Sequence, residues 1–316
     1  MTKKIIAIAG ATGAQGGGLA RAILGNPDSS FTVRALTRDV NSPKAKALAA
    51  LGAEVVTADV DDRASLDRAY AGAYGAYCVT FFWNHFSPEK EMQEARNMAL
   101  AAKQAGLQHV IWSTLEDTRK FVPLSDDRMP TLMGKYKVPH FDAKGESDHF
   151  FTDAGVPTTF LMASFYWDNF VFSGAGPSRG ADGKLTLTMP MADRPMAGIA
   201  AEDIGACALG IFKQRERFLG KTVGVASEQL TGMEMAAALS EALGEVVTYH
   251  AIAPAVYRTF GFPGAEDMGN MFQFYAEFEP YLRTARDPVI SRELNPGLLS
   301  FRAWLAKYAA QIPNIK

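Results

Sequence analysis

The chain has 316 residues, enough for one large domain and a smaller one. Its formal net charge is −2, and its charged residues, 21% of the total, are well mixed, so no basic face points to direct nucleic-acid binding. No apolar run approaches the length of a membrane span, and the two cysteines, Cys78 and Cys207, lack metal-binding or CxxC spacing. We therefore expect a soluble, cytoplasmic protein with buried thiols and no membrane partner.

The first predicted element is a strand at residues 5–9, which leads into a glycine-rich turn and a helix. In the spacing GxxGxxG the first glycine permits a tight turn and the second lets backbone N–H groups approach a phosphate. The third lets the helix pack close to the sheet. An anion then lies at the helix N-terminus. We predict that the pyrophosphate of a dinucleotide binds to the turn residues Gly10, Thr12, Gly13, Ala14, Gln15 and Gly16.

The end of the second predicted strand, residues 31–36, indicates which dinucleotide binds. A cofactor without a 2′-phosphate usually needs a carboxylate about 20 residues after the glycine turn. That window contains Leu36, Thr37 and Arg38, with no acid before Asp39. A planar guanidinium at this strand end pairs well with a 2′-phosphate. Arg38 therefore favours NADP(H) over NAD(H), although an ordinary surface arginine is the alternative.

The third predicted strand, residues 54–58, ends in the acidic turn that contains Asp59 and Val60. Acids at this strand end can accept a hydrogen bond from the adenine amino group. The same turn can also cap the helix that starts at Ala64. Both roles are compatible, and we predict that Asp59 and Val60 contact the cofactor.

The fourth predicted strand, residues 75–80, opens into an aromatic loop at 81–85. The carboxyl ends of strands in doubly wound sheets face the ligand crevice. We therefore predict that Thr80, Phe81 and Phe82 lie along the cofactor.

Alternation of strands and helices over the first half predicts an α/β, Rossmann-type doubly wound parallel sheet, followed by a smaller, mostly helical C-terminal domain. The next expected elements are a helix at 89–105, a strand at 109–113, an irregular stretch at 115–138, a helix at 141–153 and a strand at 157–162. After an excursion at 163–198 we expect a helix from 201, a strand at 222–226, a mainly helical stretch from 231 and a strand near 246–251. The predicted NADP-binding domain is 1–162 plus 200–228, and the predicted small substrate or partner domain is 163–199 plus 229–316.

The candidate catalytic residues are Ser113, at the end of the fifth strand, and Lys144 with His140, at the start of the following helix. Reductases of this fold commonly use a Tyr-x-x-x-Lys pair, in which the lysine holds the nicotinamide ribose and the tyrosine is the general acid. Here the residue four before Lys144 is His140, so the usual acid is missing.

Two catalytic readings remain open. His140 can take the place of the tyrosine, since an imidazole suits proton transfer near neutral pH. Alternatively, Lys144 donates a proton itself or orients one through water. His140 can also be a plain helix-start residue after Pro139, and Ser113 a strand-end hydroxyl. The incomplete catalytic set is what nucleotide binding without turnover would look like.

Aromatic residues near the sixth strand and in the last third of the chain have different expected roles. Phe165, Tyr166 and Trp167 are placed to line a pocket near the nicotinamide, where they suit a flat, apolar ligand or close a domain interface. The Met and aromatic residues between 268 and 278 follow helical spacing, which predicts the core face of a helix.

The chain resembles the NmrA-like family, an atypical branch of the short-chain dehydrogenase/reductases, and is most similar to its redox-sensor proteins. The matching stretches are 10–16, 36–38, 52–56, 61–62, 79–80, 140–146, 155–157, 261–265 and 270–272. The resemblance implies a Rossmann domain with a small C-terminal domain, a preference for NADP(H) and, often, no catalytic tyrosine. It also implies that Arg38 holds the 2′-phosphate and that Lys144 contacts the nicotinamide ribose.

Some relatives in this family sense the nucleotide and respond through shape, oligomerisation or a protein partner. Others in the wider group, among them quinone, triphenylmethane and isoflavone-type reductases, are enzymes. We favour an NADP(H) sensor or regulator, with an NADPH-dependent reductase of a quinone, enone or aromatic carbonyl, using Lys144, as the alternative. A protein partner, a small aromatic substrate and a homodimer are all compatible with the sequence.

Overall fold

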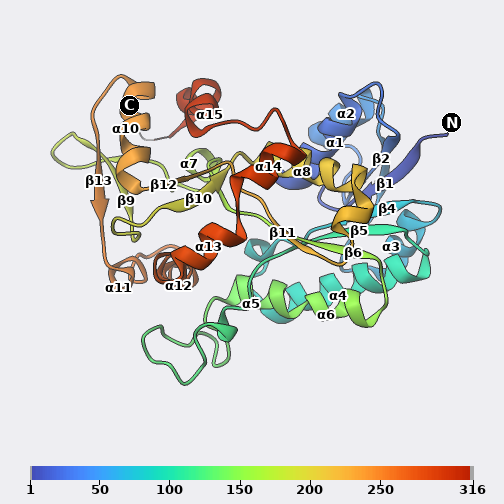
Figure 1. The fold of residues 1–316 in the computed structure, drawn as a ribbon, viewed down its shortest axis with the longest axis horizontal. Helices are drawn as coiled ribbons and strands as arrows, with labels where there is room; N and C mark the ends of the chain where they lie inside the picture. The colour runs from blue at the N-terminus through green and yellow to red at the C-terminus, as the bar shows by residue number, and fades with distance from the viewer. Residues whose placement is uncertain (1, 314–316) are drawn as a thin grey trace.

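The computed structural model describes residues 2–313. Its largest sheet has seven parallel strands in the order β11-β6-β5-β4-β1-β2-β3 (Figure 1). Their bounds are β1 Lys4–Ile8, β2 Phe31–Thr37, β3 Glu54–Thr57, β4 Gly75–Cys78, β5 His109–Thr114, β6 Thr158–Met162 and β11 Thr222–Gly224. The chain order reverses between β1 and β4. The loops after these two strands therefore flank the point where ligands bind in doubly wound sheets.

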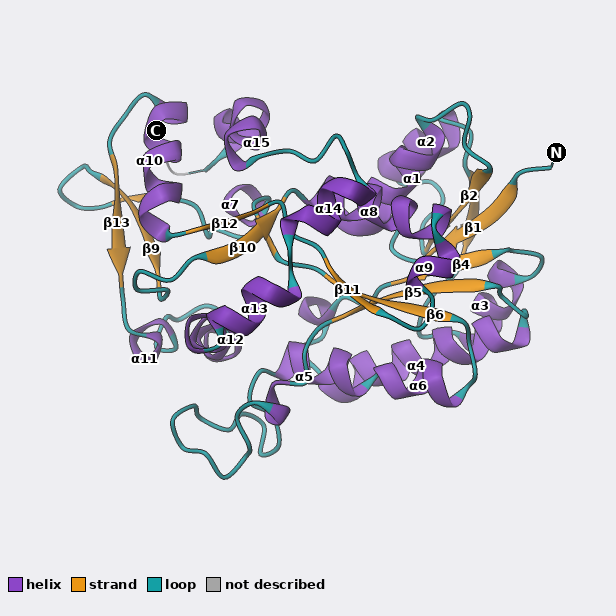
Figure 2. Ribbon diagram, viewed as in Figure 1, coloured by secondary structure: helices purple, strands orange, loops and turns teal. Residues whose placement is uncertain are grey.

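Helices cover both faces of this sheet, as Figure 2 shows. One face packs against α1, α2, α8 and α14, and the other packs against α3, α4 and α6, with α5 continuing into α6. Their bounds are α1 Ala14–Leu24, α2 Pro43–Ala50, α3 Arg63–Tyr70, α4 Pro88–Gln104, α5 Pro139–Glu146, α6 Asp148–Asp153, α8 Ala201–Lys213, α9 Arg215–Phe218 and α14 Pro288–Leu294. Glycines let α1 and α8 approach closely, because a Cβ on Gly18 would lie 2.6 Å from the carbonyl oxygen of Glu202.

Side-chain caps begin several of these helices where the sequence indicates them. The Asp62 carboxylate accepts from the backbone N–H of Ala64, which confirms the cap expected in the acidic turn. Ser87 caps α4 in the same way through the N–H of Lys90. The irregular stretch expected at 115–138 contains one short 3-10 helix, η2 Thr118–Lys120.

The rest of the chain forms a second hydrophobic core, and we call the elements that share it the small lobe. Its strands pair as β12-β10-β7 and β13-β9-β8, and its helices are α7, α10 to α13 and α15. The bounds are β7 Phe165–Tyr166, β8 Ser178–Arg179, β9 Leu185–Met189, β10 Met196–Ile199, β12 Glu228–Leu230, β13 Val247–Ala251, α7 Asn169–Phe172, α10 Gly232–Leu243, α11 Pro254–Tyr257, α12 Ala265–Glu277, α13 Glu279–Ala285, α15 Phe301–Tyr308 and η3 Ala309–Gln311. The lobe is mostly helical, as expected, but also carries two three-stranded sheets, of which the sequence pattern predicts only the strand β13, expected near 246–251.

Two further expectations concern α12 and α14. Residues of α12 between 271 and 275 are buried in the core of the small lobe, which confirms the expected core face. α14 lies within the range expected for the small domain, yet it packs on α8 and contributes Leu294 to the core of the large sheet.

The two cysteines agree with the expectation of buried thiols. Cys78 and Cys207 are free and fully buried, and burial raises the pKa of the Cys78 thiol to about 12. Among residues 2–313, no helix combines the length and apolarity needed to cross a membrane.

Candidate functional site

The glycine turn after β1 has the geometry of a phosphate cradle. Gly10 has a φ of +63°, which L side chains rarely adopt, and its carbonyl accepts from the N–H of Gly13 at 2.8 Å. A Cβ on Gly16 would lie 2.5 Å from the same carbonyl oxygen. α1 then begins at Ala14 with no side-chain cap and no acid in its first turn. Its first N–H groups are therefore left for an anion, so the residues present fit a dinucleotide phosphate.

Within the turn, Thr12 is half-buried and Ala14 is exposed, but the Gln15 side chain turns inward. Its Oε1 accepts from Ser113 Oγ at 2.8 Å and from the Tyr77 hydroxyl, and its Nε2 donates to the Tyr166 hydroxyl. Gln15 can therefore offer a ligand its backbone N–H rather than its amide. The structure brings Ser113 and Gln15 together in a buried polar network, in which the Ser113 hydroxyl already donates its hydrogen to Gln15.

Arg38 stands one residue beyond β2, at the same sheet edge as the glycine turn, because β1 and β2 pair in parallel. Its side chain is exposed and has no hydrogen bond or ion pair with any residue in 2–313. Asp59, two residues beyond β3, accepts from the Asp61 N–H at 3.0 Å, and Asn97 donates to the Val60 carbonyl at 2.9 Å. The strand ends thus align as expected, while cofactor contacts by these residues stay a prediction.

Lys144 lies on α5 and its ammonium is buried against the end of β4. It donates to Thr80 Oγ1 at 2.6 Å and to the Thr80 carbonyl at 3.3 Å, and it forms an ion pair with Glu91 at 2.8 Å. The Thr80 hydroxyl donates in turn to Glu91 at 2.6 Å. An ammonium has three N–H bonds, and these partners use them all. Glu91 was not among the predicted site residues, because in the sequence it is an ordinary acid in the first turn of α4.

Glu91 also belongs to a buried group with His85 and Glu94. The His85 Nε2 lies 3.6 Å from a Glu91 oxygen and 3.5 Å from a Glu94 oxygen. Its Nδ1 accepts from the Ser87 N–H at 3.0 Å, so the ring hydrogen sits on Nε2. A metal-bound imidazole would need that hydrogen on Nδ1, so this arrangement suits protons rather than a cation. Burial, and then the Glu91 charge, raises the pKa of Glu94 to about 8, so Glu94 carries a proton at neutral pH.

His140, the second residue of α5, pairs with a carboxylate from the small lobe. Its Nδ1 lies 2.6 Å from Asp267 Oδ1, and its backbone N–H donates to Asp267 Oδ2 at 3.2 Å. The two side chains are only 8% and 7% exposed. The His140 Nε2 has no hydrogen-bond partner within residues 2–313 and is not fully enclosed. No local sequence signal identifies Asp267, which is 127 residues away.

The aromatic loop after β4 lies against both His140 and the small lobe. Phe82 is buried in the 3-10 helix η1 (Phe82–Asn84), whereas Phe81 is 59% exposed. The His140 ring centroid lies 4.8 Å from that of Trp83 and 6.0 Å from that of Phe82. A Cβ on Gly264 would lie 2.7 Å from the Trp83 ring, so the loop touches the start of α12. Lys144 and His140, one helical turn apart, thus both face the segment 80–83.

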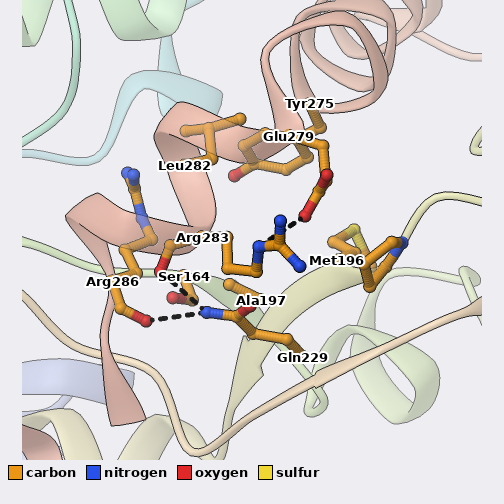
Figure 3. A pocket seen from close by; sticks show the side chains of 10 residues that line it. Ser164, Met196, Ala197, Gln229, Tyr275, Glu279, Leu282, Arg283 and Arg286 are labelled. Atoms are coloured by element: carbon orange, nitrogen blue, oxygen red, sulfur yellow. Dashed lines mark hydrogen bonds and ion pairs between the residues drawn. The ribbon is translucent and has the colours of Figure 1, made fainter.

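A separate pocket, drawn in Figure 3, lies among β10, β12, α12 and α13, and none of the predicted site residues lines it. Several of its polar groups bond or pair with one another. Gln229 donates to the carbonyls of Arg283 and Arg286 at 2.9 and 3.1 Å, and Arg283 pairs with Glu279 at 3.1 Å. The Arg286 guanidinium is bonded instead to buried Glu116 at 2.5 and 2.8 Å. Each charged side chain that lines the pocket thus has an ion-pair partner.

The fold and the site together define a doubly wound α/β protein with a phosphate-cradle turn at its switch point. The profile of the NmrA-like family matches residues 2–305, and the chain belongs to this family. This confirms the resemblance noted from the sequence.

Known relatives include both oxidoreductases and a regulator. The chain is 32% identical to the NmrA-like family domain-containing oxidoreductase hkm9 of Aspergillus hancockii over 286 residues, 86% of this chain and 82% of the relative. The crystal structure of NmrA, a negative transcriptional regulator, in complex with NADP superposes with a TM-score of 0.77 at 25% identity, over 98% and 95% of the two chains. A Citrobacter triphenylmethane reductase complexed with NADP(H) shares the fold, with a TM-score of 0.75 at 21% identity over 96% and 99% of the chains.

Proposed function

We propose that this protein is an NADP(H)-dependent oxidoreductase that reduces a quinone, enone or aromatic carbonyl. Support for the cofactor comes from the uncapped start of α1, from the unpaired guanidinium of Arg38 at the end of β2, and from the NADP bound by NmrA. Support for an oxidoreductase comes from hkm9 and similarly named relatives. In this proposal the turn holds the pyrophosphate and Arg38 holds the 2′-phosphate.

The observation that carries the proposal is the His140–Asp267 pair. His140 occupies the position four before Lys144, where a reductase of this fold keeps its acid, and both face the segment after β4. Because Nδ1 is held by the carboxylate, Nε2 is the nitrogen left to exchange a proton with a ligand. The adjoining rings of Phe82 and Trp83 suit a flat, apolar acceptor.

Lys144 has a different role in this proposal from the direct proton donor considered from the sequence. All three of its N–H bonds are used by Thr80 and Glu91, and its charge is balanced by the buried carboxylate. It therefore acts as a fixed positive charge beside the nicotinamide end of the site. That division leaves proton transfer to His140.

The proposed reduction takes up one proton from solvent. Bound NADPH supplies a hydride, which carries two electrons. Protonated His140 gives its Nε2 proton to the acceptor oxygen that gains negative charge, and solvent then returns a proton to the ring. The net change consumes NADPH, the acceptor and one proton, and yields NADP⁺ and the reduced acceptor.

A nucleotide-responsive regulator is the second candidate, and contacts between the site and the small lobe favour it. Trp83 packs against Gly264, and His140 is bonded to Asp267, so a nucleotide that shifts either residue also shifts α12. A regulator needs different affinities for the two nucleotide states, since equal binding shifts no equilibrium. In that role the protein acts through a protein partner or as a homodimer.

The test is NADPH oxidation by the purified protein with a panel of quinones, enones and aromatic aldehydes. His140→Ala is compared with His149→Ala, which removes a histidine from an exposed pair with Asp153. Saturable turnover that falls at least about 100-fold only in the first variant supports the enzyme, because general acids contribute factors of that order. Tight NADPH binding without turnover on any acceptor supports the regulator.

A further inference from the structure

The Asp267 carboxylate is unusual because it is buried and hydrogen-bonds to a single residue. Both of its oxygens bond to His140, one to the ring and one to the backbone N–H. It forms no ion pair with any lysine or arginine within residues 2–313. Its neighbour Glu266, in the same first turn of α12, is exposed. Helix position alone therefore does not explain why Asp267 is turned inward.

The pairing fixes the orientation of the His140 ring. A carboxylate accepts a hydrogen bond, so Nδ1 carries hydrogen and Nε2 points away from Asp267. A positive charge on the ring, which proton donation from Nε2 requires, lies 2.6 Å from the carboxylate oxygen. The same carboxylate satisfies the N–H of His140 at the open start of α5. Ring orientation and helix position are thus set together.

Three polar contacts hold α12 where Asp267 can reach His140. Asn270, one turn after Asp267, donates to the carbonyls of Pro130 and Lys137 at 2.9 and 2.5 Å. Gln273, a further turn on, donates to the Arg128 carbonyl at 2.8 Å. These residues share one face of α12, so that face is docked along the segment leading into α5. The docked helix, rather than a single bond, places the carboxylate.

We propose that Asp267 is the positioning residue of the His140 acid, so that the proton donor is complete only when the small lobe is docked on α5. This inference rests on the oxidoreductase function proposed above. It adds that the small lobe does more than cover the substrate, because it supplies the group that aims and balances the acid. Opening of the lobe leaves His140 misaligned while the nucleotide cradle stays intact.

The experiment measures kcat and KM for the best acceptor, and NADPH affinity, in Asp267→Asn and Glu266→Gln. The second variant removes the same charge from the same helical turn without touching His140. We expect Asp267→Asn to lower kcat at least about 30-fold, less than the roughly 100-fold or greater loss for removing the acid itself because the imidazole remains, and to leave NADPH affinity and KM within a factor of about three. Glu266→Gln should match the wild type. Asp267→Glu, which restores a carboxylate, should recover part of the loss.

A double variant separates positioning from mere loss of structure. If Asp267 acts through His140, then Asp267→Asn has no further effect on kcat in the His140→Ala background. Equal losses in both backgrounds, or full activity of Asp267→Asn, would overturn the inference while the oxidoreductase function stands. Should Asp267→Asn fail to fold, Asp267→Glu and its double variant give the same comparison. A wild-type protein without turnover overturns the proposed function, and the inference with it.

Discussion

Replacing Glu91 by Gln tests whether the buried ion pair with Lys144 holds the site together. Glu91 is fully buried, accepts from Thr80 at 2.6 Å and pairs with Lys144 at 2.8 Å. A neutral amide leaves the ammonium, only 11% exposed, without its counter-charge. Breaking such a buried pair costs about 3–5 kcal/mol. At about 2–4 °C per kcal/mol, Tm should fall by roughly 6–20 °C.

The assay is thermal unfolding at pH 7, with Glu89→Gln as the matched control. Glu89 lies on the same helix and pairs with Lys135 at 2.8 Å, but both side chains are more than half exposed. Such a surface pair contributes about 0–1 kcal/mol, so its loss should barely move Tm. Adding Lys144→Met to Glu91→Gln should restore most of the lost stability, because removing both partners leaves no unpaired charge. Equal Tm values for Glu91→Gln and Glu89→Gln would refute the reasoning.

Two further predictions concern the cofactor and pH. Arg38→Ala should weaken NADPH binding about 10- to 100-fold, because a charge-assisted hydrogen bond contributes a factor of this size, and should leave NADH binding unchanged. Both affinities are measured by fluorescence titration. Equal losses for the two nucleotides would show that Arg38 does not bind the 2′-phosphate. The pKa of Glu94 is raised to about 8 in the fold from an ordinary value of 4.5, so the folded state holds that proton more tightly. Its contribution to stability is present at low pH and is lost as pH rises through that range. The Tm of Glu94→Gln relative to the wild type should therefore increase between pH 5 and 9, and parallel curves would contradict the burial of an ionisable group there.

Local sequence signals were enough to place the phosphate cradle and most of the large sheet. The glycine turn needs a positive φ at Gly10 and no Cβ at Gly16, and only glycine at those positions provides both. The cap at Asp62 and the strand ends at Arg38 and Thr80 also depend on residues close in sequence. The strands β7 and β8 were missed because two residues are too few for an alternating pattern to appear.

The partners that define the candidate site could not be read from the sequence. Glu91 meets Lys144 only because α4 packs against α5, and Asp267 meets His140 only because α12 docks along the segment that leads into α5. Likewise, Tyr77 on β4 bonds to Gln15 on α1 because β4 lies beside β1 in the sheet. Each pair is set by tertiary packing between distant segments, so neither partner marks the other along the chain. From the sequence alone, His140 therefore lacked an identifiable carboxylate partner.

Transfer of deuterium from NADPH labelled at C4 distinguishes an oxidoreductase from a protein that only binds the nucleotide. The protein is incubated with the labelled cofactor and the acceptor panel, and deuterium bound to carbon in enone and aldehyde products is detected by mass spectrometry. Transfer to a quinone, whose O–D exchanges with water, is followed as loss of deuterium from the oxidised cofactor. We expect the wild type and His149→Ala to move deuterium to at least one acceptor, and His140→Ala, with the nucleotide still bound, to move far less. Bound nucleotide with no deuterium in any enone or aldehyde product of the wild type, and no quinone-dependent oxidation of the labelled cofactor, would contradict it.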